Sequence, residues 1–485
     1  MKLYDIISNL KFIGIKNYKD QDIESLSCNS DEKVFNGIYF CIKGFSRDGH
    51  KYACESVKNG NVCLVVENYV DLDVTQILVE DVRVAMSHIS SIFYSTYKSK
   101  MKFVGITGTN GKTTTTFIIR EILQKLGKKV GLIGTQGVFI NNLMLPSKLT
   151  TPDPIDLHKL ISDMENNGCE YCVMEVSAHS IALNKIDDIN YSIVGLTNIT
   201  EDHLDFFLNM ENYSNCKLSL FDSKHAQMGI VNSADKYAKK LREQTNISLF
   251  SFGKNGELQL ESQQTTLKGS YFKLKYQNKT FTGQTNLVGE YNLMNLLLAI
   301  SCLLCLGFDL KEILAVVKYN KITVPGRFNL LKIDADFSVL VDYAHTPDGM
   351  KNILKTVKSF APKRIITVFG CGGNRDKQKR PIMGQIANSL SDVVIVTTDN
   401  PRDENPELII EDITKGLNSN KIEKITDRKS AIEHALDIAT KQDVVVILGK
   451  GAEQYQEIKG IKFSYNDFDV VDNYFKSKIK DEIKA

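Results

Sequence analysis

The chain has 485 residues and a formal net charge of +2, so its charge gives no argument for a nucleic acid or an anionic membrane as partner. Hydrophobic residues make up 42% and charged residues 24%, as in ordinary globular proteins, and the length suggests about three domains. No apolar run approaches about 18 residues and the first residues lack a secretory leader, so we expect a cytoplasmic protein with reduced cysteines and no membrane insertion.

The first hundred residues predict a small α/β domain. Short strand and helix patterns alternate along it. The strands are expected at residues 38–42, 62–67 and 76–79, and the helices at 52–58 and 85–97. We place this N-terminal domain at residues 1–99.

A glycine-rich loop follows, at residues 105–116, which read GITGTNGKTTTT. It lies between an apolar strand pattern and a helical pattern, and in that context backbone N–H groups and the positive helix end face phosphates. Lys112 is expected to reach the β- and γ-phosphates, and Thr113 to offer its hydroxyl to Mg²⁺. The spelling departs from an ordinary P-loop, which has glycine where this chain has Ile106. The sequence therefore predicts binding of a nucleotide triphosphate.

Strand and helix patterns continue to alternate beyond this loop. Strands are expected at residues 103–106, 130–133, 171–176, 192–196 and 229–232. The alternation predicts a parallel sheet with helices on both faces. A β-rich stretch follows, at residues 258–261 and 271–276, and then a long apolar helix at 291–306. We place the central domain at residues 100–324, before the turn at Pro325 and Gly326.

The remainder of the chain predicts a third α/β domain, at residues 325–485. Its strands are expected at residues 339–341, 365–369, 393–396 and 444–448. No Gly/Ser-rich linker separates it from the central domain, so we expect the domains to face one another across a cleft.

Several strand patterns of the central domain end in polar residues. The run YCVMEVSAH (171–179) places Glu175 at the carboxyl end of a strand beside the phosphate loop, where a Mg²⁺ ligand of a nucleotide belongs. The run VGLTNITEDHLDFF (194–207) brings His203 to the same edge as a candidate ligand of a second metal. The next helix pattern places Tyr213, Lys217 and Phe221 on one face.

Further polar side chains flank the second domain boundary. Asn292 begins the apolar helix, where hydrogen bonding to a polar ring or capping explains an asparagine. Arg327 follows the turn at the boundary, from which a guanidinium reaches a phosphate once the domains close. Asp342 ends a strand, and His345 lies in the loop after it.

This combination resembles the Mur ligase superfamily, and within it the diaminopimelate-adding UDP-MurNAc-tripeptide synthetases. The shared motifs occur in family order: GTNGKTT, MEVSAH, TNITEDHLD, YxxxK, GEYNxxN, GR, DYAHTPDGM, GCGGNRDKxKRPxMG and DNPRxExP. The resemblance implies an α/β fold of three domains. A small N-terminal α/β domain binds UDP, a central P-loop ATPase-like parallel-sheet domain binds ATP, and a C-terminal Rossmann-like domain brings the incoming amino acid.

The resemblance also implies roles for residues around the nucleotide. The ATP contacts are Gly108, Thr109, Asn110, Gly111, Lys112, Thr113, Thr114, Asn292, Arg327 and Asp342. The Mg²⁺ ligands are Thr113, Glu175, His203 and Lys217, and the catalytic residues are Lys112, Lys217, His203 and Glu175. Lys217 matches the lysine that reacts with CO₂ to form a carbamate, an N6-carboxylysine. Carbamylation turns a cation into an anion able to face Mg²⁺.

The other two substrates are assigned in the same way. Contacts to UDP-MurNAc-dipeptide fall on Ser30, Phe45, Ser46, Arg47, Thr150, Thr151, Ser177 and Lys185. Contacts to diaminopimelate fall on Arg375, Asp399, Asn400, Pro401, Arg402, Gly449 and Glu453. Arg402 is expected to be buried and to take the distal carboxylate of diaminopimelate, which L-lysine lacks.

The chain departs from the family pattern at five positions. Asn29 and Asp31 stand where an aspartate and an arginine are common, Ala178 where a serine is common, and Ala452 where a histidine is common. Lys185 replaces an arginine, which keeps the charge and loses the guanidinium fork. These positions bear on substrate binding.

We therefore expect a monomeric, ADP-forming amide ligase that adds meso-diaminopimelate to UDP-MurNAc-L-Ala-D-Glu for peptidoglycan synthesis. The nearest alternative keeps this chemistry with L-lysine as the amine. A sibling adding D-Ala-D-Ala, or a folylpolyglutamate-type ligase, fits the N-terminal domain and the DNPR run less well. An alternative of another class is a non-catalytic nucleotide-binding scaffold, which the intact Lys112, Glu175, His203 and Lys217 disfavour.

Overall fold

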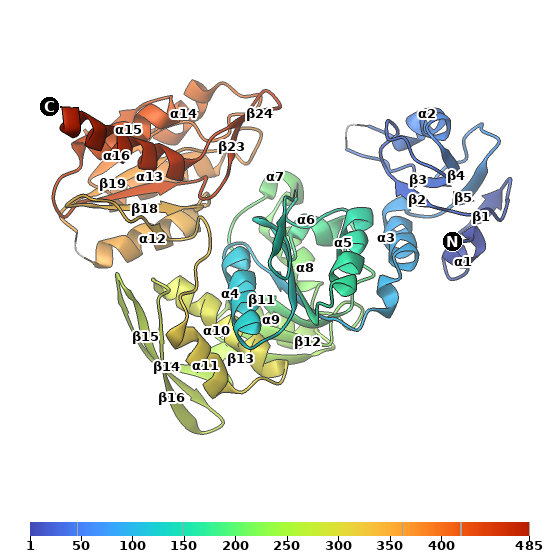
Figure 1. Cartoon of the computed structure of the whole chain (residues 1–485), viewed down its shortest axis with the longest axis horizontal. Helices are drawn as coiled ribbons and strands as arrows, with labels where there is room; N and C mark the ends of the chain where they lie inside the picture. Colours follow the sequence, from blue (N-terminus) through green and yellow to red (C-terminus); the bar gives the residue numbers. More distant parts are fainter. Residues whose placement is uncertain (46, 148, 361, 418–419, 485) are drawn as a thin grey trace.

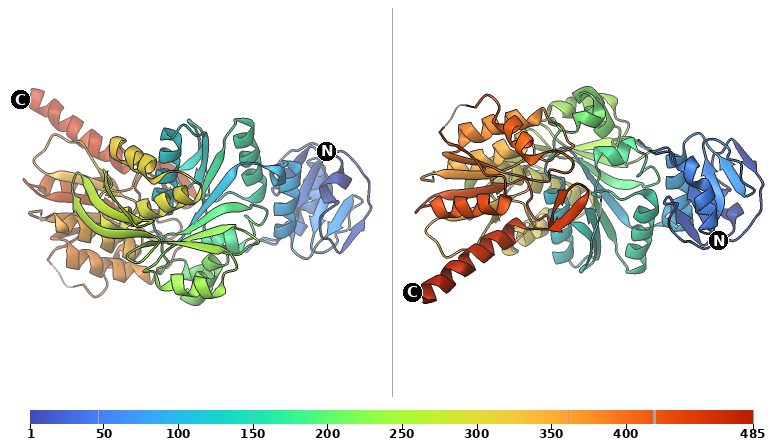
Figure 2. Two further views of the ribbon diagram at one scale, coloured as in Figure 1. Left: turned by 90° about the horizontal axis from the view of Figure 1, so that it is seen from below. Right: turned by 90° about the horizontal axis from the view of Figure 1, so that it is seen from above.

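The computed structural model describes residues 1–45, 47–147, 149–360, 362–417 and 420–484, with side chains described as far as Lys478. The molecule is elongated, with the N-terminal part at one end, the C-terminal part at the other and the central part between them (Figure 1, Figure 2). Each part has its own sheet and its own buried apolar clusters.

The N-terminal part is built on a five-stranded sheet in the order β1-β5-β4-β3-β2. β2 to β5 pair in parallel, and β1 closes one edge antiparallel to β5. The elements are α1 (Leu3–Ile7), β1 (Gly14–Lys16), β2 (Ser25–Ser27), β3 (Gly37–Phe40), the 3₁₀ turn Gly49–Tyr52, α2 (Ala53–Lys58), β4 (Asn61–Val66), β5 (Thr75–Leu78), α3 (Val82–Phe93) and the 3₁₀ turn Thr96–Lys98. β1 and β2 lie outside the sequence prediction, because three-residue strands carry too little apolar pattern to be recognised.

The central part holds an eleven-stranded sheet in the order β16-β15-β14-β13-β12-β11-β6-β10-β7-β8-β9. Its strands are β6 (Lys102–Thr107), β7 (Val130–Gly134), β8 (Gly137–Ile140), β9 (Leu143–Leu145), β10 (Tyr171–Glu175), β11 (Tyr191–Leu196), β12 (Met228–Asn232), β13 (Ser248–Gly253), β14 (Leu258–Thr266), β15 (Gly269–Tyr276) and β16 (Lys279–Thr285). The neighbouring strands β7, β10, β6, β11, β12, β13 and β14 pair in parallel, as predicted. The β-rich stretch at one edge and the β8–β9 hairpin at the other add antiparallel strands. The sheet is therefore mixed.

Helices cover both faces of this sheet, which is why its inner strands are buried apolar runs. α4 (Lys112–Lys125), α10 (Glu290–Cys305) and α11 (Leu310–Tyr319) contribute to one apolar cluster. The other face is covered by α5 (Pro154–Asn166), α6 (Ala178–Ala182), α7 (Leu204–Phe207), α8 (Met210–Leu218) and α9 (Lys236–Gln244). β6 lies between β10 and β11, so the loop after it opens at the carboxyl edge where ligands of such sheets bind.

The C-terminal part has a six-stranded sheet in the order β17-β18-β22-β19-β20-β21. The strands are β17 (Asn329–Leu330), β18 (Ser338–Asp342), β19 (Ile365–Phe369), β20 (Val393–Val396), β21 (Ile422–Lys424) and β22 (Val444–Leu448), with a separate hairpin of β23 (Tyr455–Ile458) and β24 (Ile461–Ser464). The helices are α12 (Pro347–Ser359), α13 (Lys379–Leu390), α14 (Pro406–Thr414), α15 (Arg428–Ile438) and α16 (Asp467–Lys484). The proposed domain boundaries, near residues 99 and 325, fall between the three sheets.

Candidate active site

A cavity of about 570 Å³ lies between the central and C-terminal sheets. The strand register brings the carboxyl ends of β6, β10 and β11 to the same level at one side of the cavity. Glu175 of β10 pairs with Ile106 of β6, and Leu196 of β11 pairs with Thr107. Most of the predicted site residues line it, namely Thr109, Asn110, Gly111, Lys112, Thr113, Thr114, Thr150, Glu175, Ser177, His203, Asn292, Arg327, Asp342, Arg375, Asp399, Asn400, Arg402, Gly449 and Glu453. The phosphate loop and the DNPR run, nearly 300 residues apart in the chain, thus share one cavity.

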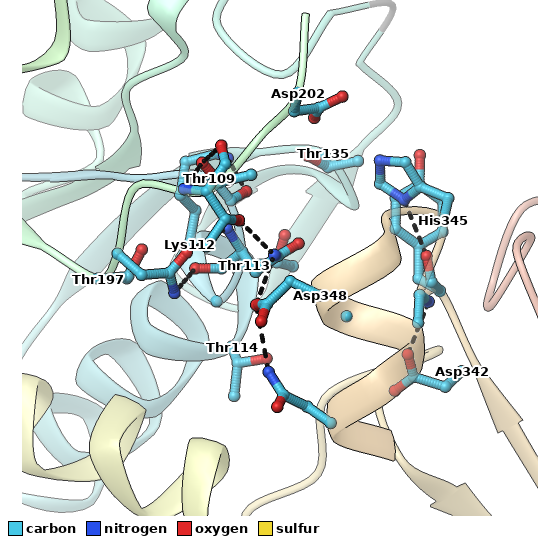
Figure 3. A pocket seen from close by; sticks show the side chains of 18 of the residues that line it. Thr109, Lys112, Thr113, Thr114, Thr135, Thr197, Asp202, Asp342, His345 and Asp348 are labelled. Atoms are coloured by element: carbon cyan, nitrogen blue, oxygen red, sulfur yellow. Dashed lines mark hydrogen bonds between the residues drawn. The ribbon is translucent and has the colours of Figure 1, made fainter. Parts of the chain in front are cut away.

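The phosphate loop is held in a conformation that requires glycine. Gly108 and Gly111 have φ values of +141° and +91°, and a side chain at either would collide with Thr197 or Asn295. Lys112 bends back over the loop, its Nζ donating to the carbonyls of Gly108 at 2.7 Å and Thr109 at 2.9 Å. Burial lowers the pKa of Lys112, opposed by Glu175 and Asp202. The Lys112 ammonium therefore lies over the phosphate loop, where a phosphate would bind (Figure 3).

Glu175 and Thr113 form an oxygen-rich pair at the head of α4. The buried Glu175 carboxylate accepts from Thr113 Oγ1 at 2.9 Å and from the backbone N–H of Thr135 at 2.8 Å. Arg327, from the linker to the C-terminal part, donates from Nη2 to Thr113 Oγ1 at 3.0 Å. A carboxylate and a hydroxyl are ligands that Mg²⁺ accepts beside phosphate oxygens and water, so this donor set fits Mg²⁺.

His203 is placed beside Asp202, with 3.3 Å between Nε2 and Oδ2, and its ring centroid lies 4.9 Å from that of His179. Burial lowers the pKa of His203 to about 3, although Asp202 opposes the shift. Burial alone would raise the pKa of Asp202, but His203 and Lys379 bring it down to about 2. The described His, Cys, Asp and Glu side chains form no cluster of three that could hold a metal. A metal-binding role for His203 therefore stays a prediction.

Lys217, on α8, is almost completely buried against the phosphate loop. Its Nζ donates to the carbonyl of Gly108 at 2.9 Å and lies 4.8 Å from the centroid of the Tyr213 ring. Burial, and then the nearby Lys112, lower the pKa of Lys217 well below its ordinary value. Within the described residues, the contacts of this ammonium are a carbonyl and an aromatic ring, with no carboxylate at ion-pair distance. Tyr213 and Lys217 lie one turn apart on α8 as predicted, but α8 ends at Leu218, so Phe221 does not continue the same helix face.

Two side chains at the start of α12, from its N-cap and its first turn, reach the phosphate loop. Thr346 Oγ1 donates to Asn110 Oδ1 at 3.1 Å, and Asn110 Nδ2 donates to Asp348 Oδ2 at 3.4 Å. Asp342, at the end of β18, accepts from the backbone N–H groups of Phe328 at 2.6 Å and Ala344 at 2.7 Å. Burial raises the pKa of Asp342, while Arg327 opposes this. The two parts are thus already hydrogen-bonded at the nucleotide end of the cavity.

The DNPR end of the cavity differs from expectation in one respect. Arg402 is not an unpaired, fully buried cation: its side chain is 21% exposed, and its Nε donates to Glu457 Oε2 at 3.1 Å. A second bond runs from Arg402 Nη1 to the carbonyl of Gly373 at 2.8 Å. Glu453 is also partnered, since Oε2 accepts from Lys450 Nζ at 2.9 Å and from Asn400 Nδ2 at 3.0 Å. The partner of Arg402, Glu457, lies on the hairpin β23–β24, and no sequence motif predicts this pairing.

The residues expected to contact UDP-MurNAc-dipeptide are spread over two regions. Thr150 and Ser177 line the main cavity, and Thr151 Oγ1 donates to the carbonyl of Glu175 at 2.8 Å. Lys185 Nζ pairs with Asp153 Oδ1 at 2.7 Å. The N-terminal residues Ser30, Phe45 and Arg47 lie away from this cavity, Phe45 being 81% exposed with its ring 5.6 Å from that of Phe206. Ser46 lies outside the described residues, so no position is given for it.

Comparison with known proteins identifies the family. Residues 106–303 match the Mur ligase middle domain, and residues 326–451 match the Mur ligase, glutamate ligase domain. A UDP-N-acetylmuramoyl-L-alanyl-D-glutamate–2,6-diaminopimelate ligase from Clostridium botulinum is 39% identical over 98% of this chain and 100% of that protein. This chain belongs to the Mur ligase family.

Other members of the Mur ligase family agree in sequence and in fold. A protein of the same name from Aquifex aeolicus is 39% identical over 93% of both chains. A solved structure of a ligase of that name superimposes with a TM-score of 0.67 at 28% identity, covering 94% of this chain and 96% of the other. The MurF ligase of Thermotoga maritima in complex with ADP has a TM-score of 0.64 at 20% identity, covering 94% and 98%, and shares the fold. In the described part of this Mur ligase, no helix is long and apolar enough to cross a membrane.

Several residues of this Mur ligase at the cavity lie outside the sequence prediction. Thr346 and Asp348 occur in the DYAHTPDGM motif, which could have pointed to them. Lys379 belongs to the GCGGNRDKxKRPxMG motif, and its Nζ lies 3.8 Å from Asp202 Oδ1. Lys450 lies between the predicted Gly449 and Glu453, in a run that could have pointed to it. Glu457 carries no local signal, because its contact with Arg402 arises from the packing of the C-terminal hairpin on the DNPR loop.

Proposed function

We propose that this Mur ligase adds meso-diaminopimelate to the γ-carboxylate of D-Glu in UDP-MurNAc-L-Ala-D-Glu, with ATP converted to ADP and phosphate. The observation that carries the proposal is the single cavity shared by the phosphate loop and the DNPR loop. One end offers a lysine, an arginine and a glycine-rich turn to a triphosphate. The other end offers Arg402, Asn400 and Glu453 to a zwitterion, so both reactants can be held together.

The chemistry takes place in two steps. A γ-carboxylate oxygen of D-Glu attacks the γ-phosphorus of ATP, the bond to the β–γ bridging oxygen breaks, and an acyl phosphate and ADP result. The neutral amino group of the second substrate then attacks the acyl carbon. The tetrahedral intermediate expels inorganic phosphate, and the nitrogen loses its proton to solvent.

The residues of the chain manage the charge of the first step. Lys112 moves from the carbonyls of Gly108 and Thr109 to the phosphate oxygens, a short displacement because it already lies over the loop. Arg327 binds the γ-phosphate from the C-terminal side. Its bond to Thr113 places the guanidinium beside the phosphate loop, an arrangement that requires the central and C-terminal parts to face each other. Mg²⁺ bound at Thr113 and Glu175 would supply further positive charge to the phosphate oxygens.

Lys217 is proposed to act as its carbamate. A buried ammonium with a carbonyl as its hydrogen-bond acceptor and with Lys112 close by is costly to maintain. Reaction of the neutral amine with CO₂ forms an N–C bond and releases a proton, leaving a carboxylate in that position. Such an anion would remove the repulsion between Lys112 and Lys217 and would be able to face Mg²⁺ at the nucleotide site.

The preference for diaminopimelate over L-lysine rests on Arg402. Diaminopimelate differs from lysine by one carboxylate on the distal carbon, and a guanidinium is the side chain best suited to bind it. Because Glu457 already neutralises Arg402, lysine would not leave a bare buried charge. L-lysine therefore remains the second candidate, and we expect a smaller discrimination than an unpaired arginine would give.

An assay with purified protein tests the proposed function. Phosphate release is measured with ATP, Mg²⁺ and UDP-MurNAc-L-Ala-D-Glu, with meso-diaminopimelate or L-lysine added or omitted. We expect turnover that needs all components and a product with the mass of the tripeptide nucleotide. Absence of turnover with either amine would favour the non-catalytic scaffold instead. Chromatography of the same protein tests the proposed monomer.

A further inference from the structure

We propose that Glu457, on strand β23 of the C-terminal hairpin, is a positioning residue that aims Arg402 at the amine substrate. The inference deepens the proposed function and rests on it. It starts from the observation that residues 456–459 lie along the DNPR loop and hold it at several points. The site for the second substrate therefore has a wall made by a segment that the DNPR motif does not include.

Backbone hydrogen bonds join this segment to the DNPR loop. The backbone N–H of Arg402 donates to the carbonyl of Glu457 at 3.0 Å, and that of Lys459 donates to the carbonyl of Arg402 at 2.8 Å. The N–H of Glu457 donates to Asn400 Oδ1 at 2.9 Å. Arg402 and Ile458 also form an isolated parallel bridge. The hairpin and the loop thus behave as one unit.

Arg402 needs such support, because its backbone is strained. Its φ is +50°, in the left-handed region that a residue with a side chain adopts at a cost of about 1 kcal/mol or more. The guanidinium is fixed as well, by Nε to Glu457 Oε2 at 3.1 Å and by Nη1 to the carbonyl of Gly373 at 2.8 Å. Within the described residues, Nη2 is left without a protein acceptor. Both N–H groups of Nη2, and the second N–H of Nη1, therefore remain available to a ligand carboxylate.

Lys450 plays a similar part for two neighbouring groups of the same site, Asn400 and Glu453. Lys450 Nζ, which is fully buried, donates to Asn400 Oδ1 at 3.0 Å and to Glu453 Oε2 at 2.9 Å. The Glu453 carboxylate, an acceptor, and the Arg402 guanidinium, a donor, are in this way held in fixed positions before the amine substrate binds. A preordered site loses less side-chain entropy on binding, which lowers KM without changing the chemical step.

The test compares Glu457→Ala and Glu457→Gln with the wild-type enzyme. Glutamine keeps an oxygen that can accept from Arg402 Nε but loses the charge. The matched control is Glu433→Ala, which removes a glutamate paired with Lys429 on α15, away from the cavity. KM and kcat are measured for meso-diaminopimelate, and KM for ATP and for UDP-MurNAc-L-Ala-D-Glu. Thermal unfolding of each variant is followed in parallel.

We expect Glu457→Ala to raise KM for meso-diaminopimelate by about tenfold, the effect of losing a hydrogen bond to a charged group, with kcat and the other KM values within about twofold. Glu457→Gln should recover most of this loss, and Glu433→Ala should behave as wild type. An unchanged KM for meso-diaminopimelate in Glu457→Ala, or an equal rise in KM for ATP, would overturn the inference alone. A wild-type enzyme that does not use meso-diaminopimelate would overturn the proposed function, and this inference with it.

Discussion

Lys112 and Lys217 direct two ammonium groups at one carbonyl oxygen, that of Gly108, at 2.7 and 2.9 Å. Two buried cations at such a short separation repel each other, and burial with this repulsion lowers the pKa of Lys217. In the proposed mechanism the phosphates of ATP are the partner of Lys112, and CO₂ reacts with Lys217. Each lysine can therefore be tested separately.

Replacing Lys112 with alanine should lower turnover by about 10²-fold or more, because no neighbouring side chain can offer an equivalent donor to the developing phosphoryl charge. Phosphate release under saturating substrates measures this. The far-ultraviolet circular dichroism of the variant should match that of wild type. Retention of more than a few percent of the activity would show that the phosphate-loop assignment is incorrect.

Replacing Lys217 with alanine should leave little activity, and acetate or formate in the buffer should restore part of it by occupying the place of the carbamate. Lys224→Ala, which removes an exposed lysine paired with Asp187, is the control and should be unaffected by either anion. Intact-mass measurement in bicarbonate buffer gives an independent readout of the carbamate. Wild-type activity of Lys217→Ala would contradict the proposal.

Among the elements, those with a strong local pattern could be predicted from the sequence. β6, the glycine loop and α4 were recognisable because an apolar run, two obligatory glycines and a helical pattern follow one another. β2 could not be found, because three residues with two serines show no periodicity. The pairing of Arg402 with Glu457 could not be found either, since it depends on how a hairpin packs against a loop 55 residues earlier in the chain.

α5 carries a buried histidine whose titration should affect stability. His158 Nδ1 lies 2.6 Å from Thr96 Oγ1, at the junction of the N-terminal and central parts, and burial lowers its pKa to about 4. The unfolded chain binds this proton near pH 6.5, so the neutral histidine contributes its full stability above pH 6.5 and loses it as the pH falls towards 4.

Between pH 7 and pH 5 this group should therefore reduce the free energy of unfolding by about 2 kcal/mol, and His158→Asn should lack that part of the decrease. Urea unfolding of wild type and variant at both pH values measures it. His434→Gln, at a half-buried position on α15, serves as the control. An equal decrease in wild type and His158→Asn would show that His158 does not titrate in this window.

At the scale of the whole molecule, the nucleotide end of the cavity is closed by bonds between two domains. Asn110 of the central part meets Thr346 and Asp348 of the C-terminal part. Removing one such bond should weaken closure over ATP. Because Thr346 Oγ1 donates directly to Asn110 Oδ1, Asn110→Ala and Thr346→Val should affect the same interaction.

A double-mutant cycle on these two residues should therefore be non-additive in kcat/KM for ATP, with a coupling energy of about 0.5–1.5 kcal/mol. Asn142→Ala combined with Thr346→Val provides a pair that shares no hydrogen bond, since Asn142 bonds Gln124 and Thr346 bonds Asn110, and additivity is expected for it. Strict additivity of Asn110→Ala and Thr346→Val would mean that the contact does not contribute to catalysis.

The central claim is that one cavity joins ATP chemistry to a site built for diaminopimelate. The most direct measurement is kcat/KM of the wild-type enzyme for meso-diaminopimelate and for L-lysine, with Arg402→Ala beside it. We predict that wild type prefers meso-diaminopimelate by about 10²-fold or more, and that Arg402→Ala loses about 2–5 kcal/mol of that recognition. Equal or better use of L-lysine by the wild-type enzyme would contradict this account.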